Sequence, residues 1–349
     1  AANITGTLPA ISGANLTGIA SAGVAENLLI NGQFSVWQRG TDSGSNTTDG
    51  VLSADRWMLA SSGATKQVTR QAFAVGQTDV PSNPKYYLRF AVTTGNNNCG
   101  LRQRIEGVDR VQGAVTLSFW AKGTNPAGGT FNITNRQDFG TGGSASSVVD
   151  TGVGDFTVTS SWVKKTFTFT PPSISGKTFG TDNNSYYELE VFRQPSGDTG
   201  TAAYTIDIAN VQLEIGSTAT DYATESYDDT LQKCKRYCHV ISQNGYSLLG
   251  IGMQYYSGYI FIDGGPIDMR TTPTMVAKAG TSGAYNYEKL FSNSAQYIHQ
   301  IGLDSKTKDK HVLFSMSGDA SRAGQAVRCA AHFFSLSNNE PYVYLTAEL

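Results

Sequence analysis

The sequence predicts an all-β protein, and three features carry this prediction. Of its 349 residues, 17 are Tyr, 16 are Phe and 38 are Gly, while only 15% are charged. Aromatic residues favour strands, and glycine favours the turns that join them. Several segments also alternate apolar and polar residues, as strands with one buried face do. Long stretches of helical periodicity are absent, so we expect β-sandwich domains.

Residues 1–26 contain an internal repeat, in which ANITG at residues 2–6 returns as ANLTG at residues 14–18. Each short unit offers one thin apolar edge that a single chain leaves uncovered, whereas three parallel copies around one axis cover it. We therefore expect a trimerisation stalk here, with a flexible linker as the alternative. Because the sequence starts at Ala1, inside the repeat, we also expect a further segment before it.

Residues 27–216 are expected to form a jelly-roll β-sandwich. VTLSFWAKG at 115–123 and WVKKTFTFTPP at 162–172 alternate apolar and polar residues, and the second ends at a Pro pair. About eight such strands over ~200 residues are more typical of a jelly roll than of a barrel or a propeller. We expect NLLINGQF at 27–34 to be the first strand and to pair near IDIANVQLE at 206–214.

Residues 217–239 predict a linker that ends in a short helix. Ser226 or Asp228 is expected to cap this helix by accepting the free backbone hydrogen bonds of its first turn. Cys234 and Cys238 fall on one face at helical spacing. We expect that face to fill the seam between two domains.

Residues 240–349 are expected to form a C-terminal β-sandwich tip. Strand-like runs separated by turns, over ~110 residues, match the size of a compact sandwich. The aromatic segments MQYYSGYIF at 253–261 and AYNYEK at 284–289 are the candidate contacts for a glycan or a protein, since Tyr combines broad apolar area with a polar tip. Strand packing or a trimer axis is an equally good explanation of them. The candidate ligand-binding residues in this region are Tyr255, Tyr256, Tyr259, Tyr285 and Tyr287.

Among the tryptophans, Trp120 is the one we expect to contact a ligand. It shares its strand face with polar side chains, and an aromatic ring in such a place can stack on a sugar. The alternative is that a loop or a neighbouring subunit covers it. Trp37 and Trp57 lie in apolar contexts and are expected in the core.

Glu188 and Glu190 point to the same side of one predicted strand, ~7 Å apart from the strand rise alone. Inverting glycoside hydrolases use a similar carboxylate separation. A face on which Arg102 and Arg104 pair with these glutamates is the favoured interpretation. The sequence contains no Ser/His/Asp order, no phosphate-binding Gly loop and no HExxH motif, so we expect no enzyme.

Charge and hydropathy argue against two further classes. The net charge is −2, and no run of Lys or Arg is present, so binding to nucleic acid is not expected. No stretch approaches the ~18 apolar residues that a membrane-spanning helix needs. The four cysteines are dispersed, which favours reduced, buried thiols over a disulfide scaffold.

Three segments together carry a family resemblance: NLLINGQFSVWQRG with ADRWML, VQLEIGSTATDYATESYDDTLQKCKRYC, and the TAEL ending after PIDMRTTPTM. They resemble the tail fibre and receptor-binding proteins of bacteriophages and prophages. This resemblance implies a homotrimeric tail fibre of the virion, with other tail proteins as partners and a bacterial surface glycan or outer-membrane receptor as its target. The alternatives are a non-binding structural fibre or head-decoration protein, and a depolymerase of capsule or glycan.

NLLINGQF and IDIANVQLE also resemble the first and last strands of jelly-roll carbohydrate-binding modules. Those modules bind sugar on a concave face and often carry a structural calcium at the rim. Asp207 matches the acidic position of the last strand, so the resemblance implies Asp207 as the candidate calcium ligand. Ser35 stands where these modules carry an acidic residue, and one carboxylate is few for an ion that takes about six to eight oxygens. No other cofactor is expected.

Overall fold

The computed structural model describes residues 26–348 apart from 61–62, 95–98, 195–202, 243–245, 257–258, 267, 278–286, 292–293, 299–300, 304–310, 318–325 and 333–342. For residues 241–266 and 275–344 it describes the backbone alone. The predicted trimerisation stalk at 1–26 lies almost entirely outside the described residues, and its trimeric state stays a prediction.

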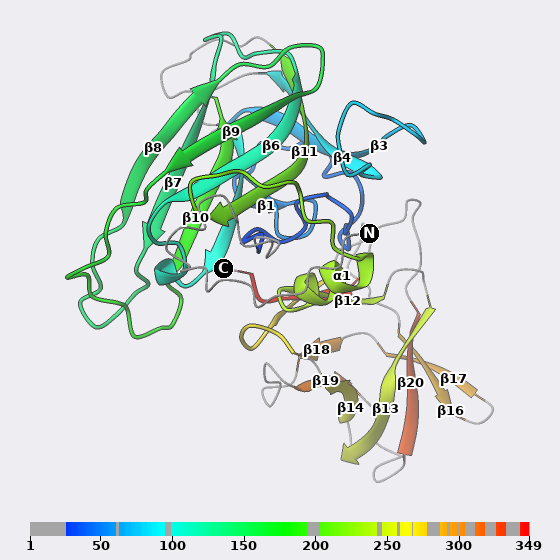
Figure 1. The fold of residues 1–349 in the computed structure, drawn as a ribbon. Helices are drawn as coiled ribbons and strands as arrows, with labels where there is room; N and C mark the ends of the chain where they lie inside the picture. Colours follow the sequence, from blue (N-terminus) through cyan, green and yellow to red (C-terminus); the bar gives the residue numbers. More distant parts are fainter. Residues whose placement is uncertain are drawn as a thin grey trace, which may run out of the picture.

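Two antiparallel sheets pack face to face as a β-sandwich (Figure 1). The six-stranded sheet has the order β1 (Val51–Leu52), β2 (Met58–Ala60), β5 (Gly100–Glu106), β10 (Tyr186–Arg193), β7 (Phe131–Asp138) and β8 (Val149–Phe156). The five-stranded sheet has the order β3 (Thr65–Ala72), β4 (Tyr86–Thr94), β11 (Tyr204–Ile215), β6 (Val115–Gly123) and β9 (Val163–Phe169). From β4 to β11 the chain crosses repeatedly between the sheets, which is the connectivity of a jelly roll. The predicted jelly-roll class is confirmed.

Strand alternation places the apolar side chains of both sheets in one continuous core. Phe131 lies at its centre, with the ring centroids of Phe192 and Tyr204 at 5.6 and 5.5 Å. Trp37 and Trp57 are 7% and 0% exposed, so their predicted place in the core is confirmed. Aromatic pairs at these separations add to the burial of apolar area that drives folding.

The opening stretch at 27–34 lies beside β11, but it is not a strand. The side chain of Asn27 donates to the carbonyl oxygen of Val211 at 2.9 Å and accepts from the amide of Leu213 at 3.0 Å. Asn31 has a φ of 61°, a left-handed conformation that interrupts the alternation of a strand. The predicted proximity to the last strand is therefore confirmed, and the prediction of a first strand here is wrong.

Helix α1 (Tyr227–Lys235) follows the sandwich and begins as predicted. The Ser226 side chain caps it by accepting a hydrogen bond from the amide of Asp229 at 3.1 Å. The helix ends before Cys238, which starts strand β12 and does not extend the helical face. Cys234 and Cys238 are both buried, and burial raises the pKa of the Cys238 thiol to about 12, so this thiol stays neutral. In the described part of the chain, no helix is long and apolar enough to cross a membrane.

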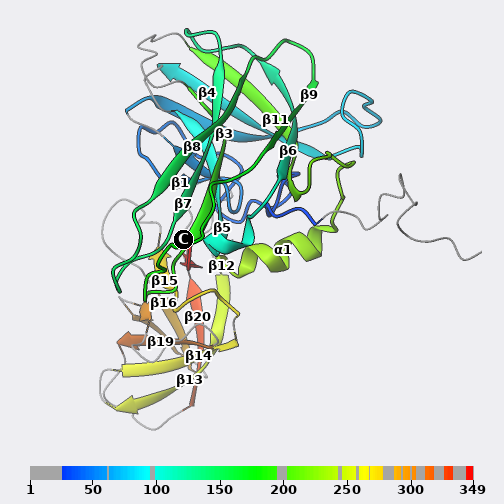
Figure 2. The ribbon, with the colours of Figure 1, turned by 60° about the vertical axis from the view of Figure 1, so that its left-hand side comes forward.

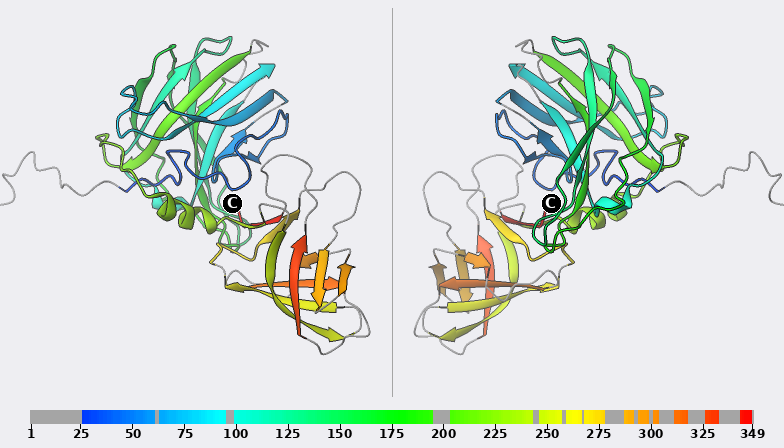
Figure 3. Two further views of the ribbon diagram at one scale, coloured as in Figure 1. Left: turned by 90° about the vertical axis from the view of Figure 1, so that its right-hand side faces the viewer. Right: turned by 90° about the vertical axis from the view of Figure 1, so that its left-hand side faces the viewer.

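The C-terminal region is β structure, as predicted. A three-stranded sheet has the order β12 (Cys238–Ser242), β21 (Val343–Thr346) and β15 (Thr274–Ala277). A seven-stranded sheet has the order β17 (Ser294–Ile298), β16 (Tyr287–Phe291), β20 (Ala326–His332), β13 (Tyr246–Tyr256), β14 (Tyr259–Pro266), β19 (His311–Ser317) and β18 (Ile301–Leu303). Figures 2 and 3 place α1 and β12 between the jelly roll and this larger sheet. The role of the region as a receptor-binding sandwich tip stays a prediction.

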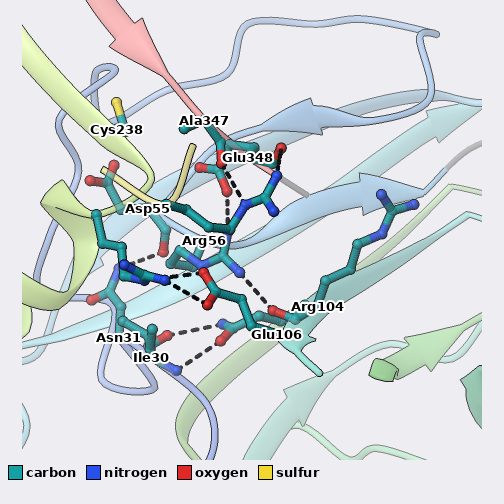
Figure 4. A network of polar contacts seen from close by, with 12 residues as sticks. Ile30, Asn31, Asp55, Arg56, Arg104, Glu106, Cys238, Ala347 and Glu348 are labelled. Carbon is teal, nitrogen blue, oxygen red and sulfur yellow. Dashed lines mark hydrogen bonds and ion pairs between the residues drawn. The ribbon is translucent and has the colours of Figure 1, made fainter. Parts of the chain in front are cut away.

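A buried ion-pair network joins the end of the chain to the jelly roll (Figure 4). The Glu348 carboxylate contacts the guanidinium of Arg39 at 2.5 Å and that of Arg56, and all three side chains are at most 10% exposed. Arg56 also donates to the carbonyl oxygen of Arg104 at 2.6 Å, and its guanidinium lies 3.4 Å from the ring centre of Tyr237. The last residues of the chain are thus fixed against the segment that opens the sandwich.

Further contacts extend this junction. The side chain of Gln38 donates to the Cys238 carbonyl oxygen at 2.8 Å, which links the jelly roll to β12. Arg236, just after α1, makes a bidentate ion pair with Glu106 of β5 at 3.1 and 2.8 Å. Burial alone would raise the pKa of Glu348, but the charges of Arg56 and Arg39 outweigh it and hold that pKa below its ordinary value.

Replacing Glu348 with glutamine is expected to destabilise the fold strongly. The change leaves the buried guanidinium groups of Arg39 and Arg56 without their main counter-charge, and breaking a buried ion pair from one side costs ~3–5 kcal/mol. Denaturant unfolding should show this loss. Asp79→Asn, in an exposed loop between β3 and β4, is the control and should change stability by less than about 0.5 kcal/mol.

The stability difference between the native chain and Glu348→Gln should depend on pH. The lowered pKa of Glu348 means that its stabilising contribution is present above its ordinary pKa of 4.5 and is lost as the pH falls further. The stability gap between the native chain and Glu348→Gln should therefore be full at pH 7 and narrow below about pH 4.5. Equal stability of the two proteins at pH 7 would contradict the network.

Candidate functional site

A polar groove of about 480 Å³ crosses the outer face of the six-stranded sheet. Its lining comes from β2, β5, β10, β7 and β8 and from Asp49 just before β1, so the groove extends across nearly the whole sheet. Apart from Ala60 and Gly152, every lining residue is polar or charged. We call this the sheet groove.

Strand register brings opposite charges together along the groove. Leu101 and Ile105 of β5 point into the core, so Arg102 and Arg104 between them point outward. The register then places Arg104 opposite Glu188 of β10. The Glu188 carboxylate lies 2.7 Å from Arg104 Nε and 3.7 Å from Arg102 Nε. The predicted cross-strand pairing is confirmed for this glutamate.

Two more ion pairs flank the centre of the groove. Arg136 of β7 and Asp150 of β8 are register partners and form a bidentate pair at 2.7 and 3.0 Å. Arg102 donates to both carboxylate oxygens of Asp49 at 3.3 and 3.1 Å. These charges therefore pair with one another along the border of the groove.

Glu190 has a different environment from Glu188. It is 7% exposed; its Oε2 accepts from Thr134 Oγ1 at 3.0 Å and lies 3.6 Å from Arg193. Burial raises the pKa of the Glu190 carboxyl to about 7, although Arg193 and Thr134 oppose this. Near neutral pH this group therefore exchanges between an acceptor and a donor of hydrogen bonds.

The lining favours a neutral ligand rich in hydroxyl groups. Four carboxylates and three arginines line the groove, so it lacks the positive excess that an anionic polymer needs. Fixed acceptors and donors alternate along it, and hydroxyl groups both donate and accept hydrogen bonds. Sugar hydroxyls match this arrangement.

Trp120 and Asp207 lie on the outer face of the other, five-stranded sheet, so the structure does not bring them to the groove. Trp120 is half-buried and pairs in register with Lys164 and Ala209. Both carboxylate oxygens of Asp207 accept from Arg89, at 2.8 and 2.9 Å.

This geometry is that of an ion pair and does not support a calcium ligand at Asp207. Lys122 adds a second cation 3.9 Å from its carboxylate. Within the residues that the structure describes, no group of three or more His, Cys, Asp or Glu side chains is arranged to hold a metal ion.

The predicted tyrosine contacts stay untested. Tyr285 lies outside the described residues, and for Tyr255, Tyr256, Tyr259 and Tyr287 the structure describes only the backbone. In that backbone, Tyr256 of β13 pairs with Tyr259 of β14.

Sequence reasoning missed several groove residues, because it did not predict β7 and β8. The signal was present: Phe131 and Ile133 alternate with polar residues that include Thr134 and Arg136. It was obscured because two later inward positions of β7, Asn135 and Gln137, are also polar. A further missed residue is Arg193.

Glu190→Gln is expected to stabilise the protein at neutral pH. The raised pKa means that the folded state keeps the proton that the unfolded state has lost, so native stability declines as the pH rises from about 4.5 to about 7. The glutamine variant lacks this decline. It should gain up to about 3 kcal/mol over the native chain at pH 8.

Glu188→Gln is the matched control on the same strand. It removes the ion-pair partner of Arg104 and should lose stability where Glu190→Gln gains it. Denaturant unfolding at pH 5 and pH 8 measures both variants. A Glu190→Gln protein that is less stable than the native chain at pH 8 would show that the buried carboxylate is well compensated.

Comparison with known protein families gives no match, and comparison with curated proteins gives none. Among solved structures, the enzymatically active domain of bacteriophage CBA120 tailspike protein 4 is 16% identical over 54% of this chain and 21% of its own, with a TM-score of 0.31. The CBM22-1 xylan-binding domain from Paenibacillus barcinonensis is 17% identical over 56% and 97%, with a TM-score of 0.31. The CBM22-1–CBM22-2 tandem domain of that organism is 13% identical over 89% and 96%, with a TM-score of 0.28. The chain thus spans about a fifth of the tailspike domain.

Proposed function

We propose that this chain is a receptor-binding subunit of a bacteriophage tail fibre, and that it attaches to a bacterial surface glycan through the sheet groove. The observation that carries the proposal is the groove itself, which is long, hydroxyl-compatible and nearly balanced in charge. The chain binds its receptor and does not cleave it.

The arrangement of the resembling segments supports the tail-fibre part of the proposal. Arg39 comes from the WQRG motif, Arg56 from ADRWML and Glu348 from TAEL, and their side chains form one buried network. Gln38 of WQRG joins the Cys238 carbonyl of KCKRYC to it. The motifs on which the resemblance depends are therefore parts of one structural junction. This junction connects the jelly roll to the C-terminal sheets.

Glycan binding of this kind needs no deep pocket if the chain is a homotrimer. Three copies on one fibre raise avidity far above the affinity of a single groove, because later contacts form within the already bound particle. A shallow polar groove that exchanges water for sugar hydroxyls is adequate in such an assembly. The remaining partners in this proposal are other tail proteins of the virion.

Hydrolysis of the bound glycan is the rival function, since Glu188 and Glu190 line the same groove. Two arginines contact the Glu188 carboxylate, which restrains it as a general base. We therefore place both glutamates in binding. The test is to incubate the protein with a capsule or O-antigen polysaccharide that it binds and to measure newly formed reducing ends. More reducing ends than in the polysaccharide incubated without protein would contradict a purely binding function.

Gly152→Trp is expected to block attachment. A Cβ at residue 152 meets no atom within 4 Å, so a large side chain enters the groove without displacing the sheet. The native protein, added in excess to host cells, should inhibit adsorption of the parent phage, whereas Gly152→Trp should lose at least about tenfold in inhibitory potency, one hydrogen-bonded contact or more.

Thr166→Trp places the same bulk on the outer face of the five-stranded sheet, where residue 166 is exposed. This control should inhibit adsorption like the native chain. Loss of inhibition by Thr166→Trp alone would instead move the site to the face that carries Trp120. Full inhibition by both variants would exclude both faces and leave the C-terminal tyrosines.

Sedimentation equilibrium of the full chain tests its assembly. Because the repeat at 1–26 needs partners to cover its apolar edge, we expect a trimer with three times the 37.3 kDa mass of one chain. Deletion of residues 1–26 should shift the equilibrium towards monomer. A stable monomer of the full chain would contradict the trimeric fibre.

A further inference from the structure

Strand β10 contains a bulge at the centre of the sheet groove. Its register shifts between Glu190 and Phe192 against β5, and between Glu190 and Arg193 against β7. In a regular strand, residues three apart point to opposite faces. The bulge changes this alternation, so both Glu190 and Arg193 line the groove. Bulges commonly re-aim side chains beside functional sites.

The neighbouring strand β5 has a glycine opposite the bulge, and the missing side chain leaves space for Glu190 and Arg193. Gly100 of β5 is the register partner of Arg193. A Cβ on residue 100 would lie 2.4 Å from the carbonyl oxygen of Phe192 and 2.7 Å from Glu190 Oε1. Any other residue would therefore displace the bulge or the carboxylate.

The polar atoms of this pair have few partners among the described residues, and Asn135 Oδ1 in the same groove lining is also without one. Oε2 of Glu190 makes both contacts of that carboxylate with the described residues, and its 3.6 Å separation from Arg193 is longer than a hydrogen bond. The Nε of Arg193 is buried and has no hydrogen-bond partner in the described part of the chain. A polar group without a partner costs free energy, and in the groove a ligand can reach the exposed part of the Arg193 guanidinium and the Glu190 carboxylate and supply further contacts.

We infer that Glu190 and Arg193 are the recognition point of the sheet groove and that they bind a vicinal diol of a neutral sugar unit. This inference rests on the proposed glycan-binding function. One hydroxyl donates to the free oxygen of Glu190, and the hydroxyl on the neighbouring carbon accepts from Arg193. Such hydroxyl oxygens are separated by about one hydrogen-bond length, ~2.8 Å, which suits two side chains held side by side.

The surrounding residues favour a diol over two other sugar groups. An acidic sugar would bring its charge beside Glu190, Glu188 and Asp150, and the arginines near these carboxylates are already paired with them. An N-acetyl group would need an apolar contact for its methyl, and Ala60 supplies the one apolar side chain of the described lining. Thr134 and Arg102 complete the polar surroundings of Glu190.

The test uses an array of purified bacterial capsular and O-antigen polysaccharides. Each is printed intact, after periodate oxidation and borohydride reduction, which destroys vicinal diols, and after de-N-acetylation. We expect the native chain to bind at least one intact polysaccharide. It should not bind the periodate-treated form of that polysaccharide, and it should still bind the de-N-acetylated form.

Variants locate the contact. Glu190→Gln and Arg193→Lys should each weaken binding by about tenfold or more, because glutamine lacks the charge of the carboxylate and lysine lacks the planar donor geometry of the guanidinium. Asp79→Asn, in the exposed loop between β3 and β4 and outside the groove lining, is the control and should change binding by less than about threefold. Unfolding curves of all variants check that each one is folded under the conditions of the binding measurement.

The outcomes separate this inference from the proposed function. If the native chain binds no polysaccharide on the array and adsorbs to no host cell, both are overturned. If it binds, but Glu190→Gln and Arg193→Lys bind equally well, glycan binding stands and the recognition point is wrong. Loss of binding after de-N-acetylation, with none after periodate, would overturn the assignment of a diol.

Discussion

The rest of the structure depends on the buried contact of Glu348 with Arg39 and Arg56. Two guanidinium groups with little access to water are stable only while a carboxylate lies against them, and that carboxylate comes from the far end of the chain. The contact holds β21 beside β12 and the opening stretch of the jelly roll beneath them. It thereby fixes how the sandwich and the C-terminal sheets share one base.

The same requirement, that a buried or half-buried charge needs a partner of opposite charge, explains the arrangement of side chains in the sheet groove. Alternation in β5 and β10 turns a row of charges outward, and antiparallel register sets Glu188 against Arg104. Along much of the groove these charges pair with one another. At the β10 bulge the alternation breaks, and there Glu190 and Arg193 come to the same face with few partners among the described residues.

Much of the sandwich was predictable, because strands such as β6 and β9 alternate cleanly between apolar and polar residues. β7 escaped prediction because its inward positions include Gln137, whose side chain donates to the Pro172 carbonyl inside the fold, a partner that local pattern does not reveal. The opening stretch was misread as a strand, since its apolar residues suggested pairing while Asn31 adopts a turn conformation. Arg193 could not be predicted as a partner of Glu190, because regular alternation places it on the opposite face. The link from Arg39 to Glu348 joins residues about 300 positions apart, and no local signal carries it.

Trp120, the aromatic residue that sequence singled out, lies on the five-stranded sheet, while the groove is built without an aromatic side chain in its described lining. We therefore propose that recognition occurs on the six-stranded sheet, at Glu190 and Arg193 of the sheet groove. A crystal structure of the chain with a bound oligosaccharide from its strongest-binding polysaccharide tests this most directly. The account predicts sugar hydroxyls within hydrogen-bond distance of Glu190 and Arg193. Sugar bound at Trp120 or at the C-terminal tyrosines, with the groove filled only by water, would contradict it.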